Sequence, residues 1–351
     1  MPLAAPAPAR AHPRLALLAI ALVLLAGCTS TGSGTPSTIG QVVDGQLAQR
    51  LKSDVSESGA FTHLQALQKI ADEHGGHRAA PGPGYQASVD HVIAALRAAG
   101  YDVGTAAYGL SQREGGGDGQ MTSQNIIAQT RTGDPGHVVM IGAHLDSVKK
   151  GPGIVDDGSG VAALLNIAGH LGASPPVRNA VRFAFFGSEE NGSQGSRSYI
   201  ESLSAEDRGK IMLYLNVDMV ASPNGGYFVQ GGTGSNKSAA GPPGSATVAH
   251  VLADQLAKTG VTAQMIEFVG DDESPFVAAN IPAAGAENGD RRKKSEEQAQ
   301  IWGGQAGQEF DPCYHTACDR LDNVNRIVLD HYLHALAGTV AYFATSGEKL
   351  S

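Results

Sequence analysis

The chain has 351 residues and a formal net charge of −9 at pH 7. An acidic balance of this size argues against binding to nucleic acid, which needs a basic surface, and it mainly supports solubility. The length suits one large α/β domain, although it also allows two.

The N-terminal residues 1–27 are typical of an export signal. Arg10 and Arg14 precede an apolar run, Leu15–Leu25, that is too short to span a bilayer as a permanent helix. The run leads into the tetrapeptide LAGC, which resembles the bacterial lipobox, whose cysteine is lipidated and becomes the mature N-terminus. Cys28 is therefore the predicted lipidation site; the simpler alternative is an ordinary cleavable signal followed by a chance cysteine.

The signal predicts an exported protein, either lipid-anchored on the outer face of the cytoplasmic membrane or secreted. Residues 28–45 begin with a stretch rich in Ser, Thr, Gly and Pro, which predicts a flexible tether. Residues 46–351 contain no repeat and no strong linker, so we expect a single domain there. We also expect a monomer.

Two helices are predicted first in the chain, at Phe61–Glu73 and Tyr85–Ala99, because their apolar residues recur with helical spacing. Gly100 follows the second helix as a stop signal. Residues 111–120 are rich in glycine and polar residues, which predicts a surface loop.

From about residue 124 the pattern alternates between strands and helices. This alternation predicts an α/β fold, a three-layer sandwich in which helices cover both faces of a mostly parallel sheet. Residues 286–310 are polar and rich in glycine, so we expect an insertion or long loop near the site. The expected strands are His137–Ala143, Val181–Phe186, Ile211–Val217, Tyr227–Gln230, Met265–Val269 and Ile281–Gly285, and the expected helices are Val161–Leu171, Thr247–Lys258 and Val324–Phe343.

Residues that bind metals follow three of these strands. They are His144 in GAHLDSV, Glu189 and Glu190 in FFGSEENGS, and Asp218 in YLNVDMVAS. In open α/β sheets, ligands bind outside the carboxyl ends of the strands, so these side chains should meet at one edge. Taken alone, each of these residues has a simpler explanation, such as a solvated turn or a buried acid. Because such residues follow three separate strands, a binding site is favoured.

Two further candidates complete the set, Asp156 in GIVDDGSG and His315 in DPCYHTACD. Histidine and carboxylate ligands suit zinc or a similar divalent ion. So many carboxylates can hold two ions with one carboxylate bridging, and paired ions stabilise both oxygens of a hydrolytic displacement. The set therefore predicts a metal-dependent hydrolase. The neighbouring Asp157 is expected to cap the following helix instead.

Cys313 and Cys318 flank His315. In an exported protein, we expect a disulfide between them that closes a small loop around this histidine. Two free thiols are the alternative.

The motifs AHLDSV, DDGSG, NVDM and PCYHTACD, with the paired glutamates, together resemble the secreted bacterial dizinc aminopeptidases, which are leucine-preferring zinc exopeptidases. The resemblance runs from about Phe61 to Thr345. It implies a zinc-exopeptidase fold and hydrolysis of the N-terminal residue of peptides, with a large apolar residue such as leucine preferred.

The resemblance also implies two Zn²⁺ per chain. His144 and Asp218 would complete one zinc site, and Glu190 and His315 would complete the other. Asp156 would be shared between them.

Further roles follow from the same resemblance. Glu189 matches the general acid/base, and Asp146 matches a carboxylate that orients His144. Tyr314 matches a residue that helps to hold the oxyanion. The family often has a cis peptide after the bridging aspartate.

One motif departs from the family pattern. Family members often have Ser-Asp-His or Ser-Asp-Tyr before a Pro-Phe pair, whereas this chain has Asp271-Asp272-Glu273-Ser274 before Pro275 and Phe276. The departure leaves the side-chain preference open. Phe276, Ile281 and Tyr314 are candidates for an apolar substrate pocket, although each could equally belong to the core.

Three rival functions remain. A glutaminyl cyclase of the same fold uses one zinc, whereas five ligands argue for two. A carboxypeptidase needs a positive group for the substrate carboxylate, and none stands out near the motifs. A non-catalytic peptide-binding lipoprotein is the third, and such proteins usually lose ligands or the general base. No Gly-x-Ser-x-Gly, nucleotide-binding or His-Glu-x-x-His motif is present.

Overall fold

The computed structural model describes residues 38–110, 121–231 and 241–350. The predicted export signal, the predicted lipidation site Cys28 and the predicted loop at 111–120 lie outside these ranges. Thr38–Ser351 cluster as one compact unit.

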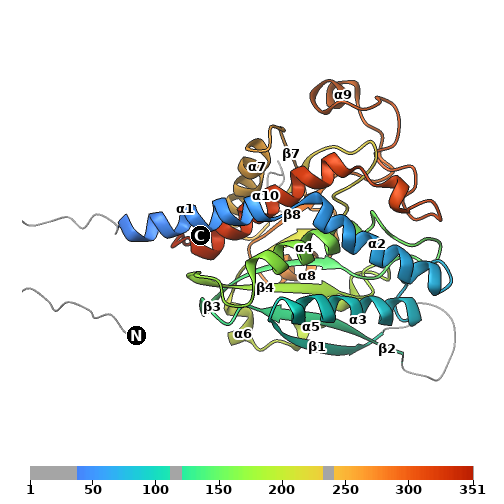
Figure 1. The fold of residues 1–351 in the computed structure, drawn as a ribbon. Coiled ribbons are helices and arrows are strands. Elements are labelled where there is room, and N and C mark those ends of the chain that lie inside the picture. The colour runs from blue at the N-terminus through green and yellow to red at the C-terminus, as the bar shows by residue number, and fades with distance from the viewer. Residues whose placement is uncertain (1–37, 111–120, 232–240, 351) are drawn as a thin grey trace, which may run out of the picture. The chain divides into compact units, whose positions relative to one another are not determined.

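An eight-stranded sheet forms the centre of this unit, in the order β1-β2-β4-β3-β5-β8-β6-β7 (Figure 1). The four central strands β4, β3, β5 and β8 are parallel, and antiparallel pairs join β1 to β2, β2 to β4 and β6 to β8. The predicted α/β class is confirmed. The strands are β1 (Asp102–Gly109), β2 (Thr122–Gln129), β3 (Asp134–His144), β4 (Asn179–Phe186), β5 (Ile211–Val217), β6 (Phe228–Gln230), β7 (Gln264–Ile266) and β8 (Ala283–Glu287).

Both faces of the central strands are buried, and β3 shows why. Its side chains alternate between faces. Val139 and Ile141 join one hydrophobic cluster, whereas Val138 and Met140 join another. A strand buried on both faces reads as a continuous apolar run, which is the pattern that made β3 predictable.

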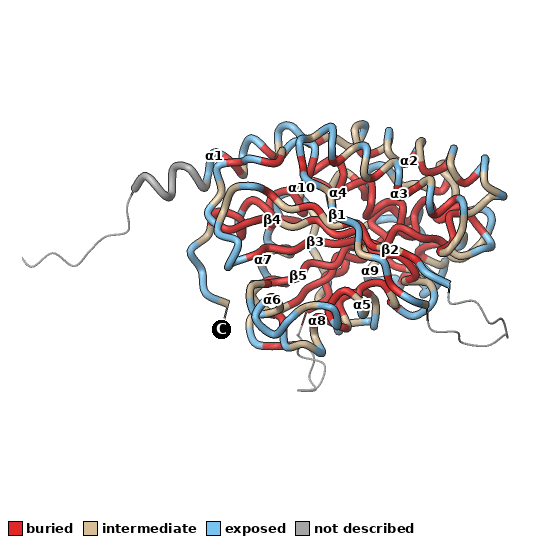
Figure 2. Tube along the Cα trace, turned by 90° about the horizontal axis from the view of Figure 1, so that it is seen from below, coloured by how far each residue is buried: buried red, intermediate tan, exposed pale blue. Residues whose placement is uncertain are grey.

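Helices cover the two faces (Figure 1). One face of the sheet, with the larger hydrophobic cluster, is covered by α1, α2, α3, α4, α7 and α10. The other face is covered by α5, α6 and α8. In Figure 2 the strands run through the buried interior, and exposed positions gather on the outer helices. The helices are α1 (Thr38–Asp54), α2 (Glu57–Glu73), α3 (Pro83–Ala98), α4 (Gly158–Leu171), α5 (Gln194–Ser202), α6 (Ala205–Gly209), α7 (Ser245–Ala257), α8 (Ser274–Ala278), α9 (Glu296–Trp302) and α10 (Arg326–Thr345).

The N-terminal part of the fold differs from the prediction. Residues 38–45, assigned to the flexible tether, belong to α1. This helix packs along α10, with Leu47 and Leu51 buried. Leucines four residues apart lie on one helix face, so tertiary packing favours a helix here.

One strand was missed, and a second was given no bounds. No strand was predicted at Asp102–Gly109, because β1 is the edge strand and is mostly exposed, so it lacks an apolar run. The sequence also gave no boundaries for β2. Tyr108 is the one buried residue of β1.

The predicted insertion at 286–310 carries α9, which projects from the rest of the fold (Figure 1). A bridge between Lys293 and Glu309 joins the two ends of this segment. Lys294 is buried there and donates to the main-chain oxygens of Gly225 and Gly303, both at 2.9 Å. The projecting segment is therefore fixed at its base.

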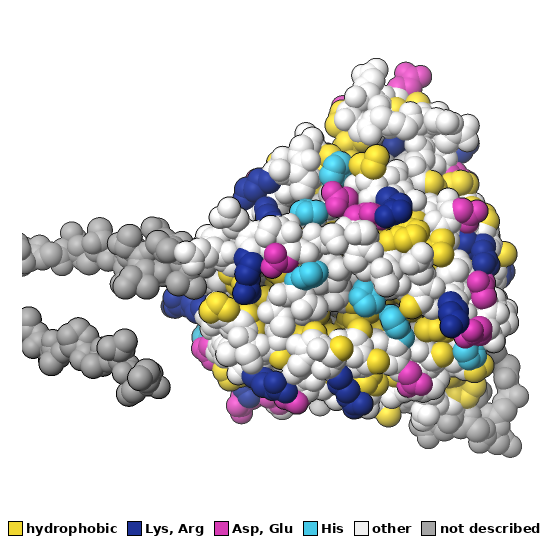
Figure 3. Space-filling model, viewed as in Figure 1, with side chains coloured by type: hydrophobic (Ala, Val, Ile, Leu, Met, Phe, Trp, Pro, Cys, Tyr) yellow, Lys and Arg dark blue, Asp and Glu magenta, His cyan; other side chains and the backbone are white. Residues whose placement is uncertain are grey.

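On the face drawn in Figure 3, basic and acidic side chains are interspersed and do not gather into one patch. Among the described helices, none is both long and apolar enough to cross a membrane.

A histidine pair between α2 and α3 predicts a pH effect on stability. His63 Nδ1 lies 3.2 Å from His91 Nε2. Burial, and then the neighbouring His91, lower the pKa of His63 to about 4, and burial lowers the pKa of His91. The unfolded chain therefore takes up protons first as the pH falls, so stability is lost between about pH 6.5 and 4.

We predict that His63→Gln reduces this loss of stability. The measurement is the free energy of unfolding in urea at pH 7 and pH 4.5, compared between the variant and the wild type. An identical pH dependence in both proteins would contradict the prediction.

Candidate metal centre and active site

Three neighbouring parallel strands deliver the predicted ligands to one edge of the sheet. His144 is the last residue of β3, Glu189 and Glu190 follow β4, and Asp218 follows β5 directly. Because β4, β3 and β5 are adjacent and parallel, their carboxyl ends lie side by side. The strand order explains why residues far apart in sequence meet here.

Asp156 lies between the two histidines. Its Oδ1 is 3.0 Å from His144 Nε2, and its Oδ2 is 3.0 Å from His315 Nε2. His315 Nε2 also lies 2.9 Å from Glu190 Oε2, and His144 Nε2 lies 3.7 Å from Asp218 Oδ1. One carboxylate therefore offers an oxygen to each half of the site.

The donor atoms form two groups in which all ligand atoms lie within 4.8 Å of one another. One contains His144, Asp157 and Asp218, and the other contains Asp156, Glu190 and His315. Such a set of nitrogen and oxygen donors suits divalent cations.

Two buried oxygens of the site support this fit. Glu190 Oε1 and Asp218 Oδ1 accept no hydrogen bond from the described residues. A buried carboxylate oxygen without a partner is costly, and a cation removes that cost. The residues present therefore fit two divalent ions, one in each group.

The electrostatics of the site also favour positive charge. Burial alone would lower the pKa of His315, but its contacts with Asp156 and Glu190 outweigh burial and raise it to about 10. Burial alone would also lower the pKa of His144. The surrounding carboxylates outweigh burial and raise this pKa well above its usual value. Burial, followed by the charge of Asp156, raises the pKa of Glu190 to about 7.

Asp157 has the capping role that its position predicts. Its Oδ1 accepts from the backbone N–H of Gly160 at 2.8 Å, at the start of α4, and from that of Met219 at 3.0 Å. These bonds connect α4 to the residue after Asp218. The peptide bond between Asp156 and Asp157 is cis.

His144 is oriented differently from the prediction. Its Nδ1 lies 3.1 Å from the main-chain oxygen of Asp146 and 3.7 Å from the Asp146 carboxylate. The carboxylate instead accepts from the backbone N–H of Glu189 at 3.1 Å. Asp146 therefore supports His144 through its main chain and the turn at Glu189 through its side chain.

The two adjacent glutamates point to different partners. Glu190 lies against His315, whereas Glu189 Oε1 accepts from Ser193 Oγ at 3.0 Å. Burial raises the pKa of Glu189 well above its usual value. Only one of the two carboxylates is thus directed at the metal ligands.

The loop that carries His315 is closed by a disulfide between Cys313 and Cys318. The Tyr314 ring stacks on the His315 ring, with centroids 3.8 Å apart. Arg291, at the base of the projecting segment, donates to the main-chain oxygen of Tyr314 at 3.2 Å.

The sequence did not predict Arg78, which is fully buried. Its guanidinium donates to the main-chain oxygens of Pro152 at 2.9 Å, Gly153 at 2.6 Å and Leu145. Arg78 therefore fixes the connection between β3 and α4, which carries Asp156. Burial lowers its pKa, and the surrounding aspartates oppose this effect.

Asp319 was missed as well. It accepts from the backbone N–H groups of Val155 at 2.8 Å and Asp156 at 3.1 Å. Burial and then the Asp156 charge raise its pKa to about 8. In the sequence, only its place directly after Cys318 pointed to a role at the site, because the residues that it contacts lie far away along the chain.

Two candidates for the substrate pocket belong to the core. Phe276 is fully buried and stacks on Tyr214 at 3.7 Å, and Ile281 is 4% exposed. The preceding acids Asp272 and Glu273 are buried too, and burial raises the pKa of each to about 7.

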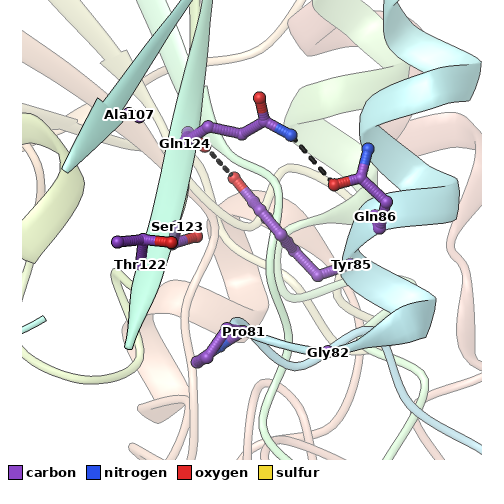
Figure 4. A pocket seen from close by; sticks show the side chains of 8 residues that line it. All are labelled: Pro81, Gly82, Tyr85, Gln86, Ala107, Thr122, Ser123 and Gln124. Atoms are coloured by element: carbon purple, nitrogen blue, oxygen red, sulfur yellow. Dashed lines mark hydrogen bonds between the residues drawn. The ribbon is translucent and has the colours of Figure 1, made fainter. Parts of the chain in front are cut away.

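A separate cavity of about 250 Å³ lies between α3 and β2 (Figure 4). Tyr85 reaches across it and donates to the main-chain oxygen of Gln124 at 2.6 Å. None of the predicted site residues lines it. A Cβ at Gly187 would lie 2.1 Å from the Tyr85 hydroxyl oxygen, so the close approach of Tyr85 requires glycine at this position, just before the Glu189 turn.

The family description "Peptidase family M28" matches residues 125–340. This range contains every predicted metal ligand. The chain belongs to peptidase family M28.

Two curated relatives show the extent of the similarity. The probable lipoprotein aminopeptidase LpqL of Mycobacterium tuberculosis is 51% identical over 213 residues, which cover 59% of this chain and 43% of that protein. The probable leucine aminopeptidase 2 of Aspergillus fumigatus is 44% identical over 230 residues, covering 65% of this chain and 46% of that protein. The matches thus span less than half of each of these relatives.

Solved structures share the fold. A zinc aminopeptidase from Bacillus subtilis superposes with a TM-score of 0.65 and 17% identity, covering 85% of this chain and 99% of that one. A Porphyromonas gingivalis glutaminyl cyclase gives a TM-score of 0.61 and 21% identity, covering 83% and 98%. At these identities the likeness concerns the fold alone.

We predict that Arg78→Met lowers the free energy of unfolding by ~3–5 kcal/mol, because it leaves buried carbonyls and aspartates without their cation. Methionine keeps most of the side-chain volume, so packing changes little. Urea denaturation measures the effect, with Arg131→Met as a control, because Arg131 forms an exposed pair with Asp102 and should matter little. Equal stability of Arg78→Met and the wild type would contradict the structural role.

Proposed function

We propose that this protein is a zinc-dependent aminopeptidase that removes the N-terminal residue from peptides. The observation that supports this proposal most is the placement of Asp156 between His144 and His315. The neighbouring Glu189 carboxylate bonds Ser193 and none of these three residues. The family membership and the names of the relatives support the proposal, and the name leucine aminopeptidase favours leucine as the first side chain to test.

His144 and Asp218 would hold one zinc ion, Glu190 and His315 the other, and Asp156 both. Bound zinc supplies Lewis acidity, which activates water and polarises the carbonyl of the scissile bond. The carboxylates and the Nε2 atoms of the two histidines would carry no proton, because their lone pairs would bind the metal, whereas His144 Nδ1 would keep its proton and donate it to the main-chain oxygen of Asp146.

Glu189 would act as the general acid/base. Its carboxylate accepts a proton from the attacking water and later gives it to the leaving amine. Glu190 is directed at His315 and cannot serve this purpose. The two adjacent glutamates thus divide ligand binding and proton transfer between them.

Tyr314 would donate its hydroxyl hydrogen to the oxyanion that develops on the scissile carbonyl. Its ring is held by stacking on His315 and its main chain by Arg291. The free α-amine of the substrate would bind among the acidic side chains, which restricts cleavage to N-terminal residues.

We also infer that the protein is exported, with a lipid on Cys28 as its anchor. The N-terminal signal and lipobox pattern support this inference, as does the name of the lipoprotein relative. A lipid-anchored enzyme of this kind would act on peptides outside the cytoplasm.

The rival functions fit less well. A carboxypeptidase needs a free cation for the substrate carboxylate, but the half-buried Arg292, whose pKa is influenced by Asp271 and Tyr314, pairs with Glu287 and with Asp290 at 2.8 Å. The complete double ligand set also argues against a one-zinc cyclase and against a binding protein that has lost catalysis.

Hydrolysis of leucine p-nitroanilide tests the proposal directly. We predict cleavage of this substrate and none of its N-acetylated form, because the acidic site requires a free α-amine. Chromogenic release by the zinc-loaded protein is the measurement. Equal cleavage of both substrates, or cleavage of neither, would overturn the aminopeptidase proposal.

Two variants separate metal binding from proton transfer. We predict that Glu189→Gln lowers kcat by at least ~10² with two zinc ions still bound. Asp156→Asn should instead lose zinc, because the shared ligand is weakened. Elemental analysis and kcat measured on the same samples check both. A Glu189→Gln variant with near-normal kcat would remove Glu189 from the mechanism.

A further inference from the structure

Ser193 stands at the N-cap position of α5, four residues after Glu189, and is 4% exposed. A serine at this position usually accepts a hydrogen bond from a backbone N–H of the first helical turn. Ser193 makes no such capping bond. Its hydroxyl instead donates to Glu189 Oε1 at 3.0 Å. The cap side chain is therefore diverted from the helix to the carboxylate.

The backbone of Ser193 also departs from the local rule. Its φ is 52° and its ψ is 40°, which is the left-handed region that glycine adopts most readily. Glycine would therefore suit the backbone better than serine, and serine gives no capping bond in return. Such local conflicts are expected where a side chain serves a functional site.

We propose that Ser193 is a positioning residue that holds the Glu189 carboxylate in the orientation for proton transfer. This inference rests on the proposed function, in which Glu189 is the general acid/base. The serine keeps its own proton and contributes only the hydrogen bond.

The contacts of Glu189 show how the positioning works. Its backbone N–H donates to Asp146 Oδ1 at 3.1 Å, and its main-chain oxygen accepts from the N–H groups of Gly192 at 2.7 Å and Ser193 at 2.8 Å. The main chain of the turn is thus fixed independently of the hydroxyl. Ser193 Oγ then fixes Oε1, which leaves Oε2 as the oxygen that exchanges the proton.

Ser193 acts on one glutamate only. Glu190 is directed at His315, and no hydrogen bond joins it to Ser193 among the described residues. Loss of the hydroxyl should therefore change proton transfer and leave metal binding intact. This separation makes the role of Ser193 measurable.

The experiment compares Ser193→Gly and Ser193→Ala with the wild type on leucine p-nitroanilide. Glycine suits the left-handed backbone, so a purely structural role predicts full activity for Ser193→Gly. The positioning role predicts that both variants lose kcat roughly tenfold, the effect of a lost hydrogen bond to a charged group. KM, inhibition by free leucine and the zinc count should stay unchanged in both variants.

A double variant localises the effect. In a Glu189→Gln background, Ser193→Gly should cause no further loss of kcat, because the group it positions is gone. Ser202→Ala is the matched control, since Ser202 ends the same helix and bonds only to the Tyr199 main-chain oxygen, at 2.7 Å. It should retain wild-type kcat.

Wild-type kcat in Ser193→Gly would overturn the inference, and so would a full additional loss in the double variant. Loss of zinc in the serine variants would also overturn it, because that outcome assigns Ser193 to metal binding. The proposed function fails separately: Glu189→Gln would then keep near-normal activity, whatever the serine variants show.

Discussion

The buried carboxylate of Asp156, placed between two imidazoles, is the contact on which the rest of the site depends. A carboxylate this deeply buried is stable only when opposite charge or hydrogen-bond donors surround it. Its two oxygens face His144 and His315, and its backbone N–H is held by Asp319. Arg78 fixes the connection that carries it. Asp156 is thus held through both its main chain and its side chain, as the proposed shared ligand requires.

The sheet supplies the geometry around this carboxylate. Adjacent parallel strands end at the same edge of the sheet. The strand order therefore places His144, the two glutamates and Asp218 close together. The turn after β4 then gives its neighbouring glutamates different contacts. Glu190 lies against His315, and Glu189 is held by Asp146 and Ser193.

The sequence predicted the parts of the protein that depend on local pattern. Buried strands such as β3 read as apolar runs, and the ligand residues follow them directly. The sequence did not predict Arg78 or Asp319, because their partners lie far away along the chain and no periodicity marks a buried charge. It also missed the edge strand β1, which lacks an apolar run. Whether the Ser193 hydroxyl caps α5 or reaches Glu189, four residues earlier, depends on the conformation of the turn between them, which no sequence pattern indicated.

The most direct test of a shared aspartate is anomalous diffraction from crystals of the zinc-loaded protein at the zinc absorption edge. The account predicts two zinc peaks per chain, one beside His144 and Asp218 and one beside Glu190 and His315, with Asp156 contacting both. A single peak, or two peaks of which only one contacts Asp156, would contradict it.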